Sequence, residues 1–176
     1  MSRPDAKRLQ GSAYVDDDGT ADPALARSLG HDGAPAASYP EVLAALADAR
    51  VLVPVVAVLG EVEHGPDGLA RDKSSDMAAV LMTGADGRTA LMGFTSTGTL
   101  TAWDPEARPV PVAARLAAAT AVQEGADALL LDVAGPTRFV VEGDDLRRLA
   151  AGWRPVRLGD GGWGWLGADP ADGGAG

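Results

Sequence analysis

The sequence predicts a single α/β domain of the α+β type, a mixed sheet of about five strands with helices packed on it. Apolar residues at helical spacing alternate along the chain with short runs rich in β-branched residues. Two pairs of these runs are separated by glycine-containing turns, which is typical of hairpins. The chain has 176 residues, 46% of them apolar, and this length suits one hydrophobic core.

Polar start signals and glycine or proline stop signals predict the main helices. These helices are expected over residues 38–49, 96–103, 113–124 and 144–150. The first has the clearest signal, because Ser38 and Glu41 have the spacing of a capping box. In the third, Leu116 and Val122 are among the residues near helical spacing, and Asp144 is the expected N-cap of the last.

The strands are predicted from apolar runs bounded by turn residues. They are expected over residues 51–59, 78–83, 88–95, 127–133 and 138–141, and the last four form two hairpins. Pro54 interrupts the first run and has no N–H to donate. This strand is therefore at a sheet edge, bulged, or turned so that Pro54 faces an unpaired side.

Composition shifts divide the chain into three parts. Residues 1–37 are a flexible polar lead-in in which only Leu25 and Leu29 suggest a short helix, and residues 38–157 form the domain. Residues 158–176 are an acidic tail rich in glycine and tryptophan, in which Trp163 and Trp165 would share one face of an extended segment. We expect these tryptophans to dock on the protein's own sheet, and their further role stays open.

Charge and composition exclude several classes of function. The absence of cysteine excludes disulfides, thiolate-ligated metals and a thiol nucleophile. The net charge of -10 argues against nucleic acid or an anionic membrane as partner. No dinucleotide-binding or P-loop motif and no convincing metal-ligand spacing is present, so we expect no cofactor and no metal.

The longest apolar run, residues 51–59, is too short to span a bilayer, and we expect a cytoplasmic protein.

One polar loop and one strand end form the candidate ligand site. Its residues are Asp72, Lys73, Ser74, Ser75, Asp76, Thr95 and Ser96. The first predicted hairpin would bring the loop beside Thr95, where the start of a helix offers backbone N–H groups. Together with the Lys73 ammonium, these donors would make a small anion-binding corner. The other interpretation is a structural loop in which Asp72 and Asp76 hold Lys73.

We expect a non-enzymatic binding or regulatory module whose ligand is an unknown protein or small molecule. No catalytic residue is assigned, because no histidine lies on an element that would orient it as a base. The alternative is a small hydrolase-like enzyme in which Lys73 activates Ser74, Ser75 or Ser96.

Five segments in a fixed order resemble a known family. They are Tyr39–Leu46, Arg50–Val56, Asp72–Ala78, Ala90–Ser96 and Gly125–Leu129. This order resembles the SseB protein N-terminal domain family in the form seen in actinobacterial proteins, over about residues 38–152. The resemblance implies a compact α/β domain, and the family supplies no established catalytic residues.

Overall fold

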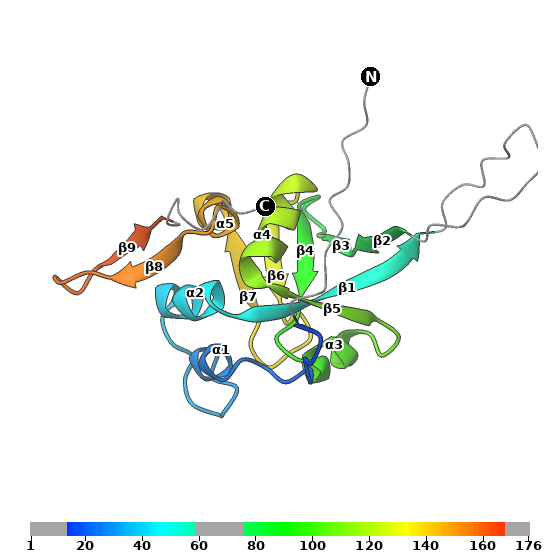
Figure 1. The fold of residues 1–176 in the computed structure, drawn as a ribbon, viewed down its shortest axis with the longest axis horizontal. Coiled ribbons are helices and arrows are strands. Elements are labelled where there is room, and N and C mark those ends of the chain that lie inside the picture. Colours follow the sequence, from blue (N-terminus) through cyan, green and yellow to red (C-terminus); the bar gives the residue numbers. More distant parts are fainter. Residues whose placement is uncertain (1–13, 59–75, 168–176) are drawn as a thin grey trace, which may run out of the picture.

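The computed structural model describes residues 14–58 and 76–167, and Figure 1 shows their arrangement. The helices of this part are α1 (Pro23–Ser28), α2 (Tyr39–Ala47), α3 (Thr97–Trp103), α4 (Ala114–Gln123) and α5 (Gly143–Ala150). The strands are β1 (Arg50–Val58), β2 (Asp76–Ala79), β3 (Leu81–Thr83), β4 (Thr89–Gly93), β5 (Arg108–Ala113), β6 (Ala128–Leu131), β7 (Phe139–Glu142), β8 (Arg154–Arg157) and β9 (Trp163–Leu166).

The strands form three open sheets, which confirms the α+β prediction. The sheet orders are β2-β1-β5, β3-β4-β6-β7 and β8-β9. All pairs are antiparallel except β4 with β6, which are parallel. Both predicted hairpins are present, as β3-β4 and β6-β7. None of the helices within the described ranges is long and apolar enough to cross a bilayer.

Pro54 lies in a central strand, because β1 pairs with β2 on one side and β5 on the other. Opposite residues of an antiparallel pair alternate between bonded and non-bonded positions. Ala114 N–H donates to the Ala49 carbonyl, and from this pair the register places Pro54 opposite Pro109 at a non-bonded position. Pro111 occupies another such position. The prolines therefore cost no hydrogen bond between β1 and β5. Pro54 lies neither at a sheet edge nor beside an unpaired side, because its carbonyl accepts the Val80 N–H on the side away from β5.

The predicted strand over residues 78–83 is divided between two sheets at Val80. The Val80 N–H donates to the Pro54 carbonyl at 3.1 Å, on the β1 side. The Val80 carbonyl accepts instead from the Met92 N–H at 3.2 Å, on the β4 side. Because Pro54 has no N–H to offer, this carbonyl is available to β4. The chain therefore passes at Val80 from pairing with β1 to pairing with β4.

The helix predictions are confirmed, with two corrections. The buried face of α4 consists of alanines, Ala114, Ala117, Ala118 and Ala121. Leu116 and Val122, which the spacing suggested for the core, are 45% and 42% exposed. Small side chains let α4 lie close to α5 and the strands, and this close packing determines which face of α4 is buried. Asp144 is not the N-cap of α5, because Glu142 takes that position and Asp144 pairs with Arg147.

Packed structure begins before residue 38, the expected start of the domain. Leu25 of α1 and Leu29 just after it are fully buried in the main core, which lies between the helices and the sheets. Asp22 caps α1 by accepting the N–H groups of Ala24 and Leu25. The described part of the expected lead-in, residues 14–37, therefore contributes to the core instead of preceding it.

The expected glycine-rich tail contains a hairpin that the sequence analysis missed. β8 and β9 form a two-stranded sheet at one end of the molecule, beside α2 (Figure 1). The Arg157 guanidinium lies 4.8 Å from the centre of the Trp163 ring, and Arg148 of α5 lies 5.5 Å from that of Trp165. Arg157 also pairs with Glu41 of α2 at 2.8 Å. Trp163 thus stacks within the hairpin, whereas the contact of Trp165 with Arg148 joins the hairpin to α5 and the Arg157–Glu41 ion pair joins it to α2.

Tyr39 joins α2 to the second sheet and to α5. Its ring lies 5.2 Å from that of Phe139 on β7, and its hydroxyl donates to the Asp145 carboxylate at 3.2 Å. Burial, followed by the negative charge of Asp145, raises the pKa of Tyr39 to about 12.

Removing the Leu25 side chain tests whether α1 belongs to the core. Leu25→Ala is expected to lower the free energy of unfolding by about 2–5 kcal/mol, the usual loss for a buried leucine. Leu116→Ala, at an exposed position of α4, is the matched control and is expected to change it by no more than about 0.5 kcal/mol. Denaturant unfolding of both variants gives the comparison, and equal effects would place α1 outside the core.

The tyrosine titration tests the contact between α2 and α5. The pKa of an unfolded tyrosine is about 10. The folded state therefore holds the Tyr39 proton more tightly than the unfolded state does. The free energy of unfolding is therefore expected to fall as the pH rises from the unfolded value toward about 12. Phenolate absorbance measures the step, and Tyr39→Phe removes it. A Tyr39 step at the ordinary tyrosine pKa would contradict the contact.

Candidate functional site

The carboxyl ends of the parallel strands β4 and β6 meet in a buried polar contact. Thr95 follows β4 and Asp132 follows β6, and both residues are fully buried. One Asp132 carboxylate oxygen accepts the Thr95 N–H at 2.9 Å, and the other accepts the Thr95 hydroxyl at 2.7 Å. This edge of an open sheet is where α/β proteins commonly bind ligands. Here the protein's own side chains occupy it.

The backbone of Asp132 and its neighbour His31 complete this contact. Asp132 has a φ of +51°, which aspartate tolerates better than most residues, and its N–H donates to the Gly93 carbonyl at 3.0 Å. His31 Nε2 is buried and lies 3.9 Å from the Asp132 carboxylate. The turn after α1 is therefore held over the same sheet edge. Sequence analysis placed His31 in the lead-in and did not single out Asp132.

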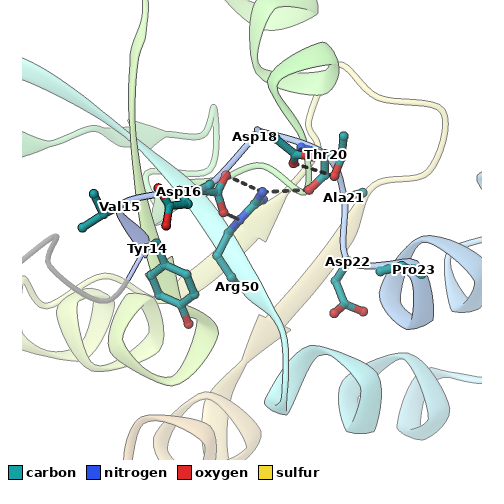
Figure 2. A pocket seen from close by; sticks show the side chains of 10 residues that line it. Tyr14, Val15, Asp16, Asp18, Thr20, Ala21, Asp22, Pro23 and Arg50 are labelled. Carbon is teal, nitrogen blue, oxygen red and sulfur yellow. Dashed lines mark hydrogen bonds and ion pairs between the residues drawn. The ribbon is translucent and has the colours of Figure 1, made fainter.

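Arg50 ties a third segment to this edge, residues 14–20, which we call the N-terminal strap. The Arg50 guanidinium pairs with the Asp17 carboxylate, donates to the Thr95 carbonyl at 2.9 Å and donates to the Thr20 carbonyl at 2.7 Å. Figure 2 shows Arg50 reaching from β1 into the strap. Arginine suits this position because its planar fork supplies several donors in fixed directions. The strap, β1 and the end of β4 are therefore fastened through one side chain.

A hollow of about 690 Å³ lies beside Arg50 and the strap (Figure 2). Aspartates dominate its polar lining, but three of them bind the chain itself: Asp17 pairs with Arg50, Asp18 accepts from Thr20, and Asp22 caps α1. Within the described ranges, no three carboxylate or histidine side chains are arranged to hold a metal ion. The hollow is thus lined mainly by side chains whose role is to attach the N-terminal strap to Arg50 and to begin α1.

The structure separates the parts of the predicted ligand site that it describes. Asp72, Lys73, Ser74 and Ser75 lie outside the described residues. Asp76 pairs with Val58 at one end of β1, whereas Phe94 pairs with Leu52 near the other end. Six residues of strand correspond to about 20 Å. Asp76 is therefore far from Thr95, because the change of partner at Val80 ends the hairpin that was expected to bring them together.

Several of the backbone N–H groups expected to bind an anion at the start of α3 have partners within the chain. The Thr95 N–H donates to Asp132, the Thr97 N–H to the Gly19 carbonyl, and the Thr99 N–H to the Ser96 hydroxyl oxygen. Ser96 is therefore the N-cap of α3, at the start of the helix expected over residues 96–103, and Phe94 and Met92 are buried. The N–H groups of Thr95, Thr97 and Thr99 are thus already used within the chain.

A different candidate surface lies on the four-stranded sheet. One face of β3-β4-β6-β7, which carries Leu91, Leu129 and Val141, is buried in the main core with α4 and α5. On the other face, a smaller cluster that includes Met92 and Leu100 of α3 covers the end near Thr95. Where this cluster ends, the sheet is hollowed by an apolar pocket of about 150 Å³.

All four strands supply residues to this pocket, which we call the open-face pocket. Its apolar lining residues are Met82, Ala90, Ala128, Leu130 and Val140. The register places Ala128 between Ala90 and Glu142, and Leu130 beside Val140. Val140 is 37% exposed. The sequence carried a signal for this face, because residues 128–131 are apolar on both alternations, as in strands covered on both sides.

The rim of the open-face pocket is charged. Arg88 pairs with Glu142 at 2.5 Å, and both side chains are about half exposed. Asp127 also lines the pocket and accepts the Thr89 N–H at 2.8 Å. The hydrogen bond and charge of Glu142, followed by the charges of Asp127 and Asp86, raise the pKa of Arg88. The guanidinium is therefore paired with one carboxylate and lies within the field of two others.

A family model matches most of this chain. The model of the SseB protein N-terminal domain family matches residues 24–148, more than two thirds of the chain. The chain belongs to this family. The SseB domain therefore begins within α1, earlier than the resemblance suggested, and the match ends within α5, before the β8-β9 hairpin. No curated protein and no solved structure matches the chain.

Replacing Asp132 tests whether its carboxylate is structural. Asp132→Ala leaves the Thr95 N–H and hydroxyl without their acceptor in a buried place, and is expected to lower the free energy of unfolding by about 2–5 kcal/mol. Asp127→Ala is the matched control, because Asp127 flanks the other end of β6 and also accepts an N–H from the β4 side, but in an exposed place. It is expected to cost about 1 kcal/mol or less. Equal losses in thermal or denaturant unfolding would contradict this role.

Proposed function

We propose that this SseB-family protein is a non-enzymatic binding module whose docking surface is the open face of the β3-β4-β6-β7 sheet. The observation that carries the proposal is the open-face pocket, an apolar hollow built from all four strands of a sheet whose opposite face is already packed in the main core. An apolar hollow at the surface of a folded domain, rimmed by polar residues, commonly marks an interaction site.

The size of the pocket favours a protein partner over a metabolite. Sites for small molecules typically enclose about 300–1,000 Å³, whereas the open-face pocket has about 150 Å³. A cavity of roughly 150 Å³ lined by apolar side chains accommodates one benzene ring. The pocket is therefore of the size of one apolar side chain, which is how a docking segment anchors itself in a surface hollow.

The polar residues where β4 and β6 end are bonded within the chain. This supports a structural role for that edge of the sheet, and favours the open face as the proposed binding surface instead. Thr95 and Asp132 satisfy each other, and the hydroxyl oxygen of Ser96 accepts the Thr99 N–H as a helix cap. A nucleophilic serine needs a neighbouring base that is itself oriented by a third group. Lys73, the base of the hydrolase alternative, lies outside the described residues, and no observation within them favours that alternative.

A charge placed in the pocket tests the docking surface. Val140→Asp is expected to abolish binding of the proteins that co-purify with the wild type from its host, because a carboxylate would have to be buried against the partner. Val122→Asp is the matched control, since Val122 has similar exposure but lies on α4. Both variants should keep the thermal stability of the wild type within a few degrees. Each protein retained by the wild type and by Val122→Asp is then purified and titrated against all three forms. Equal affinity for Val140→Asp would overturn the proposal.

A further inference from the structure

The rim of the open-face pocket carries an excess of negative charge. Arg88 is paired with Glu142, and the charges of Asp127 and Asp86 also act on its guanidinium. The charged side chains that line the pocket are Glu142, Asp127 and Arg88, which leaves the rim about one charge negative, and Asp86 in the adjoining turn adds a further negative charge nearby. The chain as a whole has a net charge of -10, so the long-range field has the same sign as the rim.

These charges are accessible to a partner. The Arg88 and Glu142 side chains are 53% and 52% exposed, and the hydrogen bond from Thr89 to Asp127 is also at the surface. A partner can therefore approach the carboxylates from solvent while its apolar side chain enters the hollow between Ala90, Leu130 and Val140. Complementary charge at such a rim mainly sets the partner's identity and its rate of association.

The observations favour a cationic partner over a second copy of the chain. Two copies facing each other through this surface would bring two negative rims together, and each whole copy carries a net charge of -10. Like charges across an interface are unfavourable and select against the wrong partner. A segment that flanks one apolar side chain with lysine or arginine has the opposite charge at the rim and the right size for the hollow.

We propose that the open-face pocket receives one large apolar side chain of a basic protein segment, with flanking lysine or arginine residues placed against Glu142 and Asp127. This inference rests on the proposed function, because it names the partner chemistry of the same docking surface.

Short synthetic peptides test the partner chemistry directly. The probes are the peptides Lys-Arg-Phe-Arg-Lys, Lys-Arg-Ser-Arg-Lys and Glu-Asp-Phe-Asp-Glu, titrated to millimolar concentration and followed by amide chemical shifts. Only the first is expected to shift Ala90, Leu130, Val140 and Glu142 together, and its binding should weaken as salt is added. Removing the phenylalanine or reversing the flanking charges removes one of the two features that the pocket and its rim select.

A charge reversal at the rim separates local from global electrostatics. Glu142→Arg is expected to weaken binding of Lys-Arg-Phe-Arg-Lys by about threefold to tenfold, the range for losing exposed ion pairs and adding a repulsion. Glu106→Arg changes the net charge equally at an exposed position away from the pocket, and should leave the affinity unchanged. Equal weakening by both variants would overturn the inference, since it would mean that the peptide responds to the net charge of the protein and not to the carboxylates of the rim.

The outcomes distinguish this inference from the proposed function. If the acidic phenylalanine peptide shifts the same residues as strongly as the basic one, the docking surface stands and the basic partner is wrong. If no phenylalanine peptide shifts them and Val140→Asp also leaves the retained proteins bound, both proposals fail. If the protein is a dimer that Val140→Asp makes monomeric, a second copy occupies the face and the inference is overturned.

Discussion

The buried contact between Thr95 and Asp132 is the constraint on which the arrangement of this domain depends. It joins the ends of two parallel strands whose connection runs through α3, β5 and α4. Arg50 extends the contact to β1 and the N-terminal strap, and His31 brings the turn after α1 to the same place. Buried polar groups of this kind are costly unless every partner is present, so the contact favours one mutual placement of these segments over others.

Local signals in the sequence predicted most of the elements correctly. Caps such as Ser38 with Glu41, and Ser96 before α3, depend on residues three positions apart, so the chain itself carries the information. The family was also recognisable from ordered local segments, and the match over residues 24–148 confirms it. Predictions failed where distant packing decides the outcome, as on α4, where alanines face the core and Leu116 faces solvent.

The predicted ligand corner shows the same limit. It depended on a hairpin that continues past Val80, yet the pairing partner of that residue is chosen by Pro54, 26 positions earlier in the sequence. Asp132 was equally hard to assign, since an acidic residue at the end of an apolar strand is common and its partner Thr95 lies far along the chain. The open-face pocket was closer to prediction. The apolar residues on both faces of β6 were visible in the sequence, but the sequence did not show that no helix within residues 14–58 and 76–167 lies over the pocket.

The β8-β9 hairpin stands apart from the rest of the fold in how it is held. A two-stranded sheet is marginal by itself, and this one follows the segment that the family model matches. Its attachments include the ion pair of Arg157 with Glu41 and the stacking of Arg148 on Trp165. Trp165 also packs against the main core, but it is only partly buried there, so we expect the hairpin to detach as a local unit. Its amides should therefore exchange with solvent through a local detachment long before the domain unfolds.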